Sequence, residues 1–296
     1  MSPRISFVGE HRNRLGESPL WDERIARLWW VDSVARLICR SDANGGGLES
    51  WTAPSEVGSI ALAETGLLAA LQDGFHAFDP LDGSFEPIAV PEAGNATVRF
   101  NDGKADRQGR FLSGTMRTSA EHGAPGKLYR LEPDATTTML ETGTRVSNAL
   151  CFSPDGGILY FADSLAMAVW AYDYDIDTGA ATNRRVLIDT KPLGSAPDGA
   201  TVDLAGDLWV TLVQGQALAQ VSSAGALLRR IDLPIPFPSC PAFGGPGLTT
   251  LFLTTVSDSG GALKTDHPDG GRMLALNGLD AVGLPEARCP IPRRHR

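Results

Sequence analysis

The sequence contains few cysteines, and none of them lie close together. Cys39, Cys151, Cys240 and Cys289 include no C-x-x-C pair, so they match neither a zinc knuckle nor a disulfide framework. We expect all four to be free thiols, buried as small hydrophobic side chains.

Positive charge and long apolar runs are scarce as well. The formal net charge is −9, and the basic run is the short tail from Arg293 to Arg296, which provides no footprint for nucleic acid. No segment approaches the ~20 apolar residues of a membrane span, and residues 1–14 lack the apolar core of a signal peptide. We therefore predict a cytoplasmic protein, a monomer or weak homo-oligomer, that binds neither nucleic acid nor membranes.

The motifs of serine hydrolases are absent too. The sequence has no G-x-S-x-G, and its five histidines form no evident triad with a serine and an acid. His76 lies in an alternating segment, so we expect it to be packed rather than catalytic.

What the sequence does contain is a repeated unit, separated by turns that account for many of its 33 Gly and 20 Pro. A short apolar segment recurs at intervals of 39, 43, 49, 49 and 43 residues, close to the ~40–50 residues of a four-stranded propeller blade. Its six copies are Leu28–Val31, Leu67–Ala70, Arg110–Ser113, Leu159–Ala162, Leu208–Thr211 and Leu251–Thr254.

A second segment follows in these units and alternates apolar and polar residues, as in Arg36–Arg40 and Lys127–Leu131. This period of two is typical of half-buried strands. Six such units predict an all-β fold, a six-bladed β-propeller with a central metal site, formed by residues 1–296 as one domain. A β-sandwich would not explain the period. We expect the N-terminal strand, Arg4–Val8, to close the ring by pairing with Arg272–Leu276.

Four polar residues stand 9 to 11 residues before the repeated apolar segment of their units: Glu17, Asn101, Asn148 and Asp198. Equivalent positions of a propeller converge on its central axis. Two carboxylates and two amide oxygens suit Ca²⁺, Mg²⁺ or Mn²⁺ and, with fewer ligands, Zn²⁺. Each residue alone is equally a turn or loop residue, so the prediction depends on all four together.

The motifs around these positions resemble the SMP-30/gluconolactonase (regucalcin-like) family. The resemblance extends from about residue 13 to about residue 275 and includes Leu15–Asp22, Arg99–Lys104, Ser147–Gly156 and Pro197–Asp203. It implies one central divalent cation, Ca²⁺ or Zn²⁺ first, with Mg²⁺, Mn²⁺ or Fe²⁺ as alternatives.

The resemblance also implies a role for each site residue. Glu17, Asn148 and Asp198 would bind the cation, Asp198 would also act as the general base, and Arg99 and Asn101 would contact the substrate. From the pattern around Arg99 we expect this residue to stand in a turn, on the same side as Asn101.

The activity implied is hydrolysis of a sugar (aldono-)lactone, such as a glucono- or pentonolactone, to the aldonic acid. Two alternatives stay open, because a fold does not decide a function: a non-catalytic propeller that binds calcium or another ligand, and a metal-dependent esterase that acts on a non-sugar lactone. The chain departs from the family at Val213–Gln216 and at Arg117–Glu121. There Glu121 is the candidate for a further substrate contact, and His122 is a loop residue near the expected channel mouth.

Overall fold

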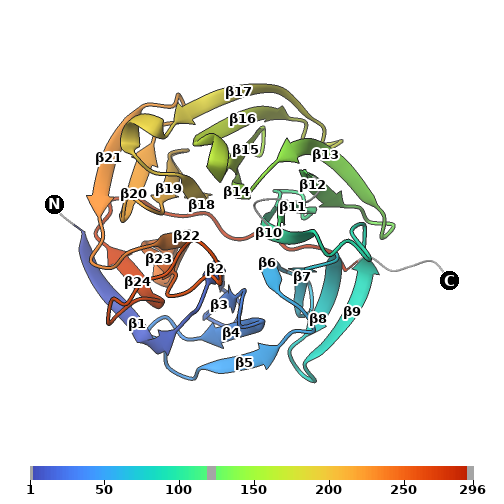
Figure 1. The fold of residues 1–296 in the computed structure, drawn as a ribbon, viewed down its shortest axis with the longest axis horizontal. Coiled ribbons are helices and arrows are strands. Elements are labelled where there is room, and N and C mark those ends of the chain that lie inside the picture. Colours follow the sequence, from blue (N-terminus) through green and yellow to red (C-terminus); the bar gives the residue numbers. More distant parts are fainter. Residues whose placement is uncertain (1–2, 119–124, 292–296) are drawn as a thin grey trace.

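The computed structural model describes residues 3–118 and 125–291, and it is a six-bladed β-propeller (Figure 1). Six antiparallel sheets of four strands each stand around a central axis. Regular helix in the described ranges is limited to three 3₁₀ turns, η1 Ser164–Ala166, η2 Lys191–Leu193 and η3 Pro246–Leu248. The predicted all-β, six-bladed propeller is therefore confirmed, whereas its central metal site stays a prediction.

The strands follow one another from the channel outward within each blade, and then the chain moves to the next blade. Blades 1 to 3 contain β2 Gly16–Asp22, β3 Arg27–Asp32, β4 Leu37–Ser41, β5 Glu49–Thr52; β6 Val57–Leu62, β7 Leu67–Leu71, β8 Phe75–Asp79, β9 Ser84–Ala89; and β10 Val98–Ala105, β11 Phe111–Arg117, β12 Gly126–Leu131, β13 Thr137–Thr144. Blades 4 to 6 contain β14 Ser147–Phe152, β15 Ile158–Asp163, β16 Ala168–Tyr174, β17 Ala181–Asp189; β18 Pro197–Val202, β19 Leu208–Leu212, β20 Ala217–Val221, β21 Leu227–Asp232; and β22 Pro238–Gly244, β23 Thr250–Thr255, β24 Arg272–Asn277, β1 Arg4–Arg12.

The repeated apolar segment forms the second strand of every blade, where both faces are buried. Residues of β7 and β19 are all buried, whereas most residues of the outermost strands β5 and β21 are exposed. The core lies between neighbouring blades, as where the fully buried Trp209 of blade 5 packs edge-on against Phe243 of blade 6. Each innermost strand is therefore held between packed layers, which makes the channel a rigid place to hold side chains.

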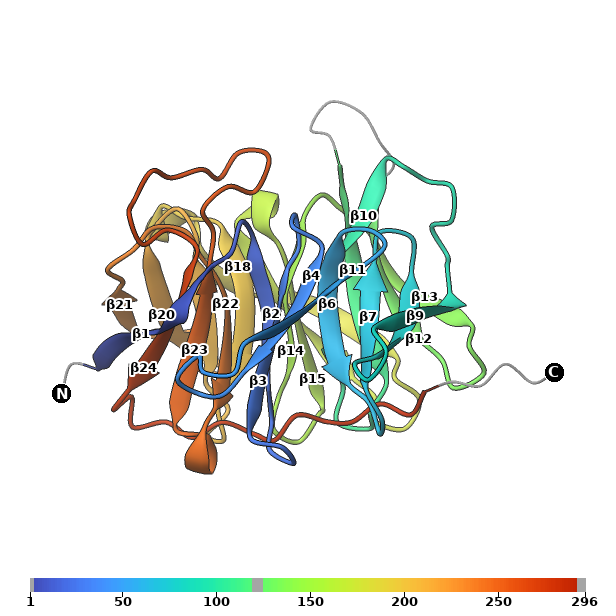
Figure 2. The same ribbon diagram turned by 90° about the horizontal axis from the view of Figure 1, so that it is seen from below.

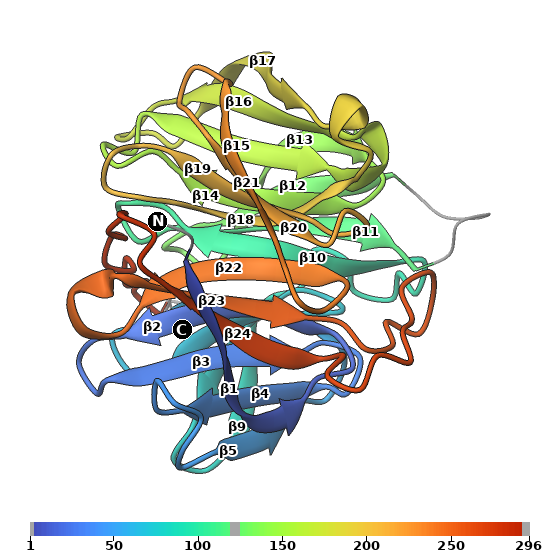
Figure 3. The ribbon, with the colours of Figure 1, turned by 90° about the vertical axis from the view of Figure 1, so that its left-hand side faces the viewer.

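The sixth blade is completed by the N-terminal strand. β1 pairs antiparallel with β24, in a register that sets Arg4 opposite Asn277 and Val8 opposite Met273. Figure 3 shows β1 lying along β24 at the outer edge of this blade. Whether the whole chain of 296 residues acts as one domain stays a prediction.

The segment that follows β24 crosses the ring, and we call residues 278–291 the C-terminal strap. Figures 1 and 2 show it passing over the end of the channel from blade 6 to blades 2 and 3. Backbone bonds fix it at both ends: Leu204 N–H donates to Val282 O at 2.7 Å in blade 5, and Cys289 N–H donates to Leu62 O at 2.8 Å in blade 2. The strap thus joins opposite sides of the ring.

Two further expectations, one about the cysteines and one about membrane spans, can be compared with the structure. The four cysteines are buried and free, as predicted. In residues 3–118 and 125–291 there is no helix with the length and apolar character needed to cross a membrane.

Candidate active site in the central channel

Each of the six innermost strands has a break in its pairing register at the same place. In the blades that carry candidate residues, the break follows Glu17 in β2, Phe100 in β10, Asn148 in β14 and Pro197 in β18. A β-bulge bends the strand and changes the direction of its side chains. The bulges therefore recur where the four candidate residues stand, and Gly58 and Ser239 occupy the corresponding places in β6 and β22.

In two of the bulges, a residue other than glycine has a positive φ, in the left-handed region of the Ramachandran plot. Ser18, directly after Glu17, has φ 48°, and Ala149, directly after Asn148, has φ 52°. Such a conformation is uncommon for residues with a side chain and is found preferentially at functional sites. The local backbone at two candidate residues is thus held by the surrounding fold.

The inner strands approach each other so closely that two of the ring positions require glycine. A Cβ atom on Gly58 would lie 2.4 Å from Asn101 O, and one on Gly199 would lie 2.5 Å from the sulfur of Cys240. These glycines allow the inner strand of blade 2 to pack closely against that of blade 3, and the inner strand of blade 5 against that of blade 6. Among the candidate side chains, Arg99, Asn101 and Asn148 lie within hydrogen-bond distance of one another in sequence order.

Arg99 and Asn101 are joined directly. The Arg99 Nη1 donates to Asn101 Oδ1 at 2.8 Å and to Phe100 O at 2.9 Å, and the Arg99 Nε lies 3.1 Å from Glu56 Oε2. Arg99 is 9% exposed and belongs to β10, so the expectation that it stands in a turn is wrong. Arg99 pairs regularly with Met116, and the bulge of this strand begins after Phe100; nothing in the local sequence marks the bulge.

Asn101 connects Arg99 to Asn148 in the next blade. Its Nδ2 donates to Asn148 Oδ1 at 3.0 Å and to Ser147 O at 2.9 Å. The amide of Asn148 in turn donates from Nδ2 to Ser164 Oγ at 2.8 Å. Three candidate residues, Arg99, Asn101 and Asn148, therefore form one connected and buried group.

The carboxyl groups of Glu17 and Asp198 share the same environment. Burial, and then the charge of Asp198, raises the pKa of Glu17 well above its usual value. Burial and the charge of Asp102 raise the pKa of Asp198 to about 8, and Arg99 acts in the opposite direction. The site thus gathers acidic groups in a low-dielectric place with one nearby guanidinium, which favours a cation as a partner.

Asp102 is a third buried carboxyl group, and its role differs. Its two oxygens accept 2.8 Å hydrogen bonds from the backbone N–H groups of Gly103 and Leu150, which lie in neighbouring blades. Burial raises the pKa of Asp102 to about 6, and these two bonds lower it. Asp102 therefore joins β10 to β14 while adding negative charge to the channel.

The donor set fits a hard divalent cation. Within residues 3–118 and 125–291, no three His, Cys, Asp or Glu side chains are arranged to hold a metal ion, so a site here needs an amide oxygen as well. Glu17, Asp198 and Asn148 offer two carboxylates and one amide, and none of the described residues donates a hydrogen bond to the carboxylate of Asp198. Such a sparse oxygen set leaves positions open for water or substrate.

Other residues singled out from the sequence lie elsewhere. Glu121 and His122 are outside the described residues. His76 is buried in β8, its Nδ1 is 3.2 Å from Gly74 O, and burial lowers its pKa. It lies in the wall of a cavity of about 390 Å³ whose lining also includes Ser55, the neighbour of Glu56.

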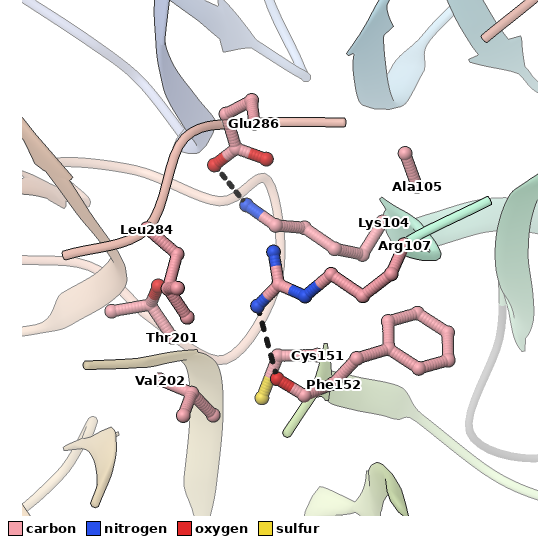
Figure 4. A pocket seen from close by; sticks show the side chains of 9 residues that line it. All are labelled: Lys104, Ala105, Arg107, Cys151, Phe152, Thr201, Val202, Leu284 and Glu286. Atoms are coloured by element: carbon pink, nitrogen blue, oxygen red, sulfur yellow. Dashed lines mark hydrogen bonds and ion pairs between the residues drawn. The ribbon is translucent and has the colours of Figure 1, made fainter. Parts of the chain in front are cut away.

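The far end of the channel is covered by the strap (Figure 4). Lys104 of β10 forms an ion pair with Glu286 of the strap. Between the inner strands, Leu284 and Glu286 there is a cavity of about 10 Å³, room for about one water molecule. Glu17, Arg99, Asn148 and Asp198 lie at the other end of the inner strands, near the starts of β2, β10, β14 and β18.

Three contributors to the site were not among the sequence predictions: Glu56, Asp102 and Ser164. A signal did exist for Ser164, because Ala162-Asp163-Ser164 ends the second strand of blade 4 as Val31-Asp32-Ser33 ends that of blade 1. Nothing comparable points to Glu56, which reaches Arg99 from a loop of another blade.

Comparison with known proteins gives matches over nearly the whole chain. The profile described as the SMP-30/Gluconolactonase/LRE-like region matches residues 15–257. Regucalcin of Gallus gallus is 33% identical over 291 residues, with 96% of this chain and 97% of that protein covered. Pentonolactonase XacC of Haloferax volcanii is 34% identical over 291 residues, with 97% and 98% covered. The solved structure of a calcium-binding protein, regucalcin, from Agrobacterium tumefaciens has a TM-score of 0.88 and 27% identity, covering 99% of this chain and 97% of that one.

Proposed function

This chain belongs to the SMP-30/gluconolactonase/LRE-like family, and from that premise we propose that it hydrolyses a sugar lactone to the aldonic acid with the help of one divalent cation. The family includes proteins named lactonases, among them the pentonolactonase of Haloferax volcanii. Glucono- and pentonolactones are the substrates we expect.

One observation carries the proposal: a buried pair of carboxyl groups, Glu17 and Asp198, stands in the same channel as the guanidinium of Arg99. The pair suits a cation, and the guanidinium suits the oxygens of a neutral, oxygen-rich ring. A ligand that presents a carbonyl and several hydroxyl groups meets both demands.

We assign cation binding to Glu17, Asn148 and Asp198. A bound divalent cation would polarise the lactone carbonyl and make water more acidic. The family relatives named regucalcin, one of them described as calcium-binding, support Ca²⁺ as a first choice, with Zn²⁺ next and Mg²⁺, Mn²⁺ or Fe²⁺ as alternatives.

Substrate orientation is assigned to Arg99 and Asn101. Glu56 and Asn101 occupy Nε and Nη1 of Arg99, and no described residue accepts from its Nη2, which is left to donate to the lactone. This division holds the guanidinium at a fixed angle, so the substrate is oriented without loss of side-chain freedom at the moment of binding.

Asp198 is the proposed base. As the oxygen of water adds to the carbonyl carbon, the Asp198 carboxylate accepts a proton from that water. The bond between the carbonyl carbon and the ring oxygen then breaks, the ring oxygen takes up the proton held by Asp198, and the aldonic acid is released with the carboxylate regenerated. A carboxylate in a buried place is a stronger base than one in water, because burial disfavours its charge.

The test is a panel of aldonolactones and of non-sugar lactones, assayed for acid release by the full-length chain. We expect turnover of sugar lactones that is lost after chelation and returns with Ca²⁺ or Zn²⁺. Full turnover by a preparation shown to be free of metal would contradict the proposed cation. Cation binding without turnover of any lactone would favour the non-catalytic alternative, and turnover of non-sugar lactones alone would favour the esterase.

A further inference from the structure

Four side chains form a continuous line of hydrogen bonds across blades 3, 4 and 5. Arg99 Nη1 donates to Asn101 Oδ1 at 2.8 Å, and Asn101 Nδ2 donates to Asn148 Oδ1 at 3.0 Å. Asn148 Nδ2 then donates to Ser164 Oγ at 2.8 Å, and Ser164 Oγ donates to Pro197 O at 2.7 Å. All four side chains are buried, and the line ends one residue before Asp198.

The direction of this line is fixed at both ends. A guanidinium has donors and no acceptor, and a backbone carbonyl has acceptors and no donor. Arg99 therefore forces Asn101 to turn its oxygen toward the guanidinium and its nitrogen toward Asn148. At the other end, the carbonyl of Pro197 takes the single proton of the Ser164 hydroxyl, so Ser164 must accept from the amide nitrogen of Asn148.

The orientation of the Asn148 amide follows. Turned by 180°, it would oppose its nitrogen to the Asn101 nitrogen, donor against donor, and would leave Ser164 without a proton to accept. The oxygen that we propose as a cation ligand is thus kept on the Asn101 side and cannot exchange places with the nitrogen.

We propose that Ser164 is a positioning residue for the cation site: its hydroxyl, anchored on Pro197 O, holds the Asn148 amide with the oxygen available for metal binding. This inference rests on the proposed function, because it takes Asn148 as a ligand. Mutating a residue that forms a hydrogen bond to a metal ligand and fixes its orientation typically lowers metal affinity by about tenfold to a hundredfold.

Blade 1 provides a matched control. Ser33 follows Asp32 as Ser164 follows Asp163, and each serine donates its backbone N–H to the loop before its blade, Ser33 to Leu15 O and Ser164 to Val146 O. Both serines are buried, at 1% and 7% exposure. The Ser33 hydroxyl, however, has no hydrogen-bond partner among the described residues.

The experiment measures Ca²⁺ and Zn²⁺ affinity by isothermal titration calorimetry on the full-length chain, with melting temperature followed in parallel. Ser164→Ala should weaken cation binding by about tenfold to a hundredfold, Ser33→Ala by less than about twofold, and Ser164→Thr, which keeps the hydroxyl, should bind within about threefold of the wild type. In an Asn148→Ala background, Ser164→Ala should cause no further loss.

Two results would overturn the inference while leaving the cation site in place. One is wild-type affinity in Ser164→Ala, and the other is an equal loss in Ser164→Ala and Ser33→Ala, which would show that any buried serine at this position affects the site through stability. If the wild type itself binds neither cation, the proposed function fails together with the inference.

Discussion

The contacts of Arg99 bear directly on its proposed role in substrate binding. Its Nε and Nη1 are occupied by Glu56 and Asn101, both close to the channel. Neither Asp102 nor Asp106, the acidic neighbours that a structural arginine would use, forms an ion pair with it. Asp106 instead pairs with Arg110.

Replacing Arg99 with alanine should impair substrate recognition. We expect kcat/KM to fall by about tenfold to a hundredfold, because one charge-assisted contact contributes roughly 1.5 to 3 kcal/mol. Arg99→Lys should restore part of the loss, since an ammonium lacks the planar fork. Steady-state kinetics and melting curves on the same variants check this. A large drop in melting temperature with unchanged kinetics would identify Arg99 as structural.

Asp198 combines two proposed roles, so its loss should be more severe. Asp198→Asn keeps the shape of the side chain and removes its charge and its basicity. We expect turnover to fall by at least about a hundredfold, the lower range for a general base. The measurement is kcat at saturating cation, and an unchanged kcat would remove Asp198 from the mechanism.

The acidic pair also predicts how the metal-free protein responds to pH. Burial and then the charge of Asp102 raise the folded-state pKa of Asp198 to about 8, and burial and then the charge of Asp198 raise that of Glu17 well above its usual value. Folding therefore favours the protonated forms of both groups. The stability that these two carboxyl groups contribute is fully present below their pKa values in the unfolded chain. It is lost as the pH rises through their pKa values in the folded protein. After chelation, the melting temperature should therefore fall between about pH 5 and about pH 8.

The control for this prediction is Asp198→Asn, which removes one carboxyl group and with it the repulsion that raises the pKa of Glu17. Its melting temperature without metal should exceed that of the wild type at about pH 8, by about 2 °C or more. Buried His76, with a lowered pKa, shifts stability in the opposite direction in both proteins, and Asp102, whose pKa is raised to about 6, acts in the same direction in both. The difference between the two proteins therefore reports on Asp198 and on its effect on Glu17. Equal pH profiles of the two proteins would contradict the assignment.

At the scale of elements, the spacing of the repeated strands was enough to predict the ring. The apolar segments at 28–31 and 208–211 became β3 and β19 because a doubly buried second strand needs a continuous apolar run, a signal that composition and period both carry. The placing of Glu17, Asn148 and Asp198 ahead of these strands also followed from spacing.

The bulges could not be predicted in this way. Their register shift at Glu17, Asn148 and Asp198 arises where six strands crowd around one axis, and φ values of 48° at Ser18 and 52° at Ala149 have no counterpart in residue preference. Contacts such as Glu56 with Arg99 join different blades, and a sequence pattern within one repeat holds no information about them.

The strand β1 allows a test of ring closure. Removing residues 1–9 would leave β24 with an unpaired edge, and we expect the melting temperature to fall by at least about 5 °C. A chain that starts at Arg4 keeps β1 whole and serves as the control. Unaltered melting of the shorter protein would show that closure does not need β1, and one cooperative transition in the control is the result expected of a single domain.

At the scale of the whole molecule, the ring is joined both around its circumference and across its diameter. Pairing of β1 with β24 closes the circumference, while the strap connects blade 5, through Leu204, with blade 2, through Leu62. Lys104 and Glu286 add an ion pair beside the axis. Blades on opposite sides therefore cannot separate without loosening the strap.

The strap crosses one end of the central axis of the ring, so ligands that bind at the proposed site would have to enter and leave at the other end. If the cation binds at Glu17, Asn148 and Asp198 as proposed, and the lactone binds between it and the entrance, the ion can leave only after the sugar has left. We expect saturating aldonic acid, or a lactam analogue that resists hydrolysis, to slow the removal of cation by excess chelator, measured by stopped-flow with a metal indicator. Equal removal rates with and without the ligand would mean that ions escape past the strap. On this proposal, product release would control the release of the ion, and the strap would be the part of the fold responsible for that coupling.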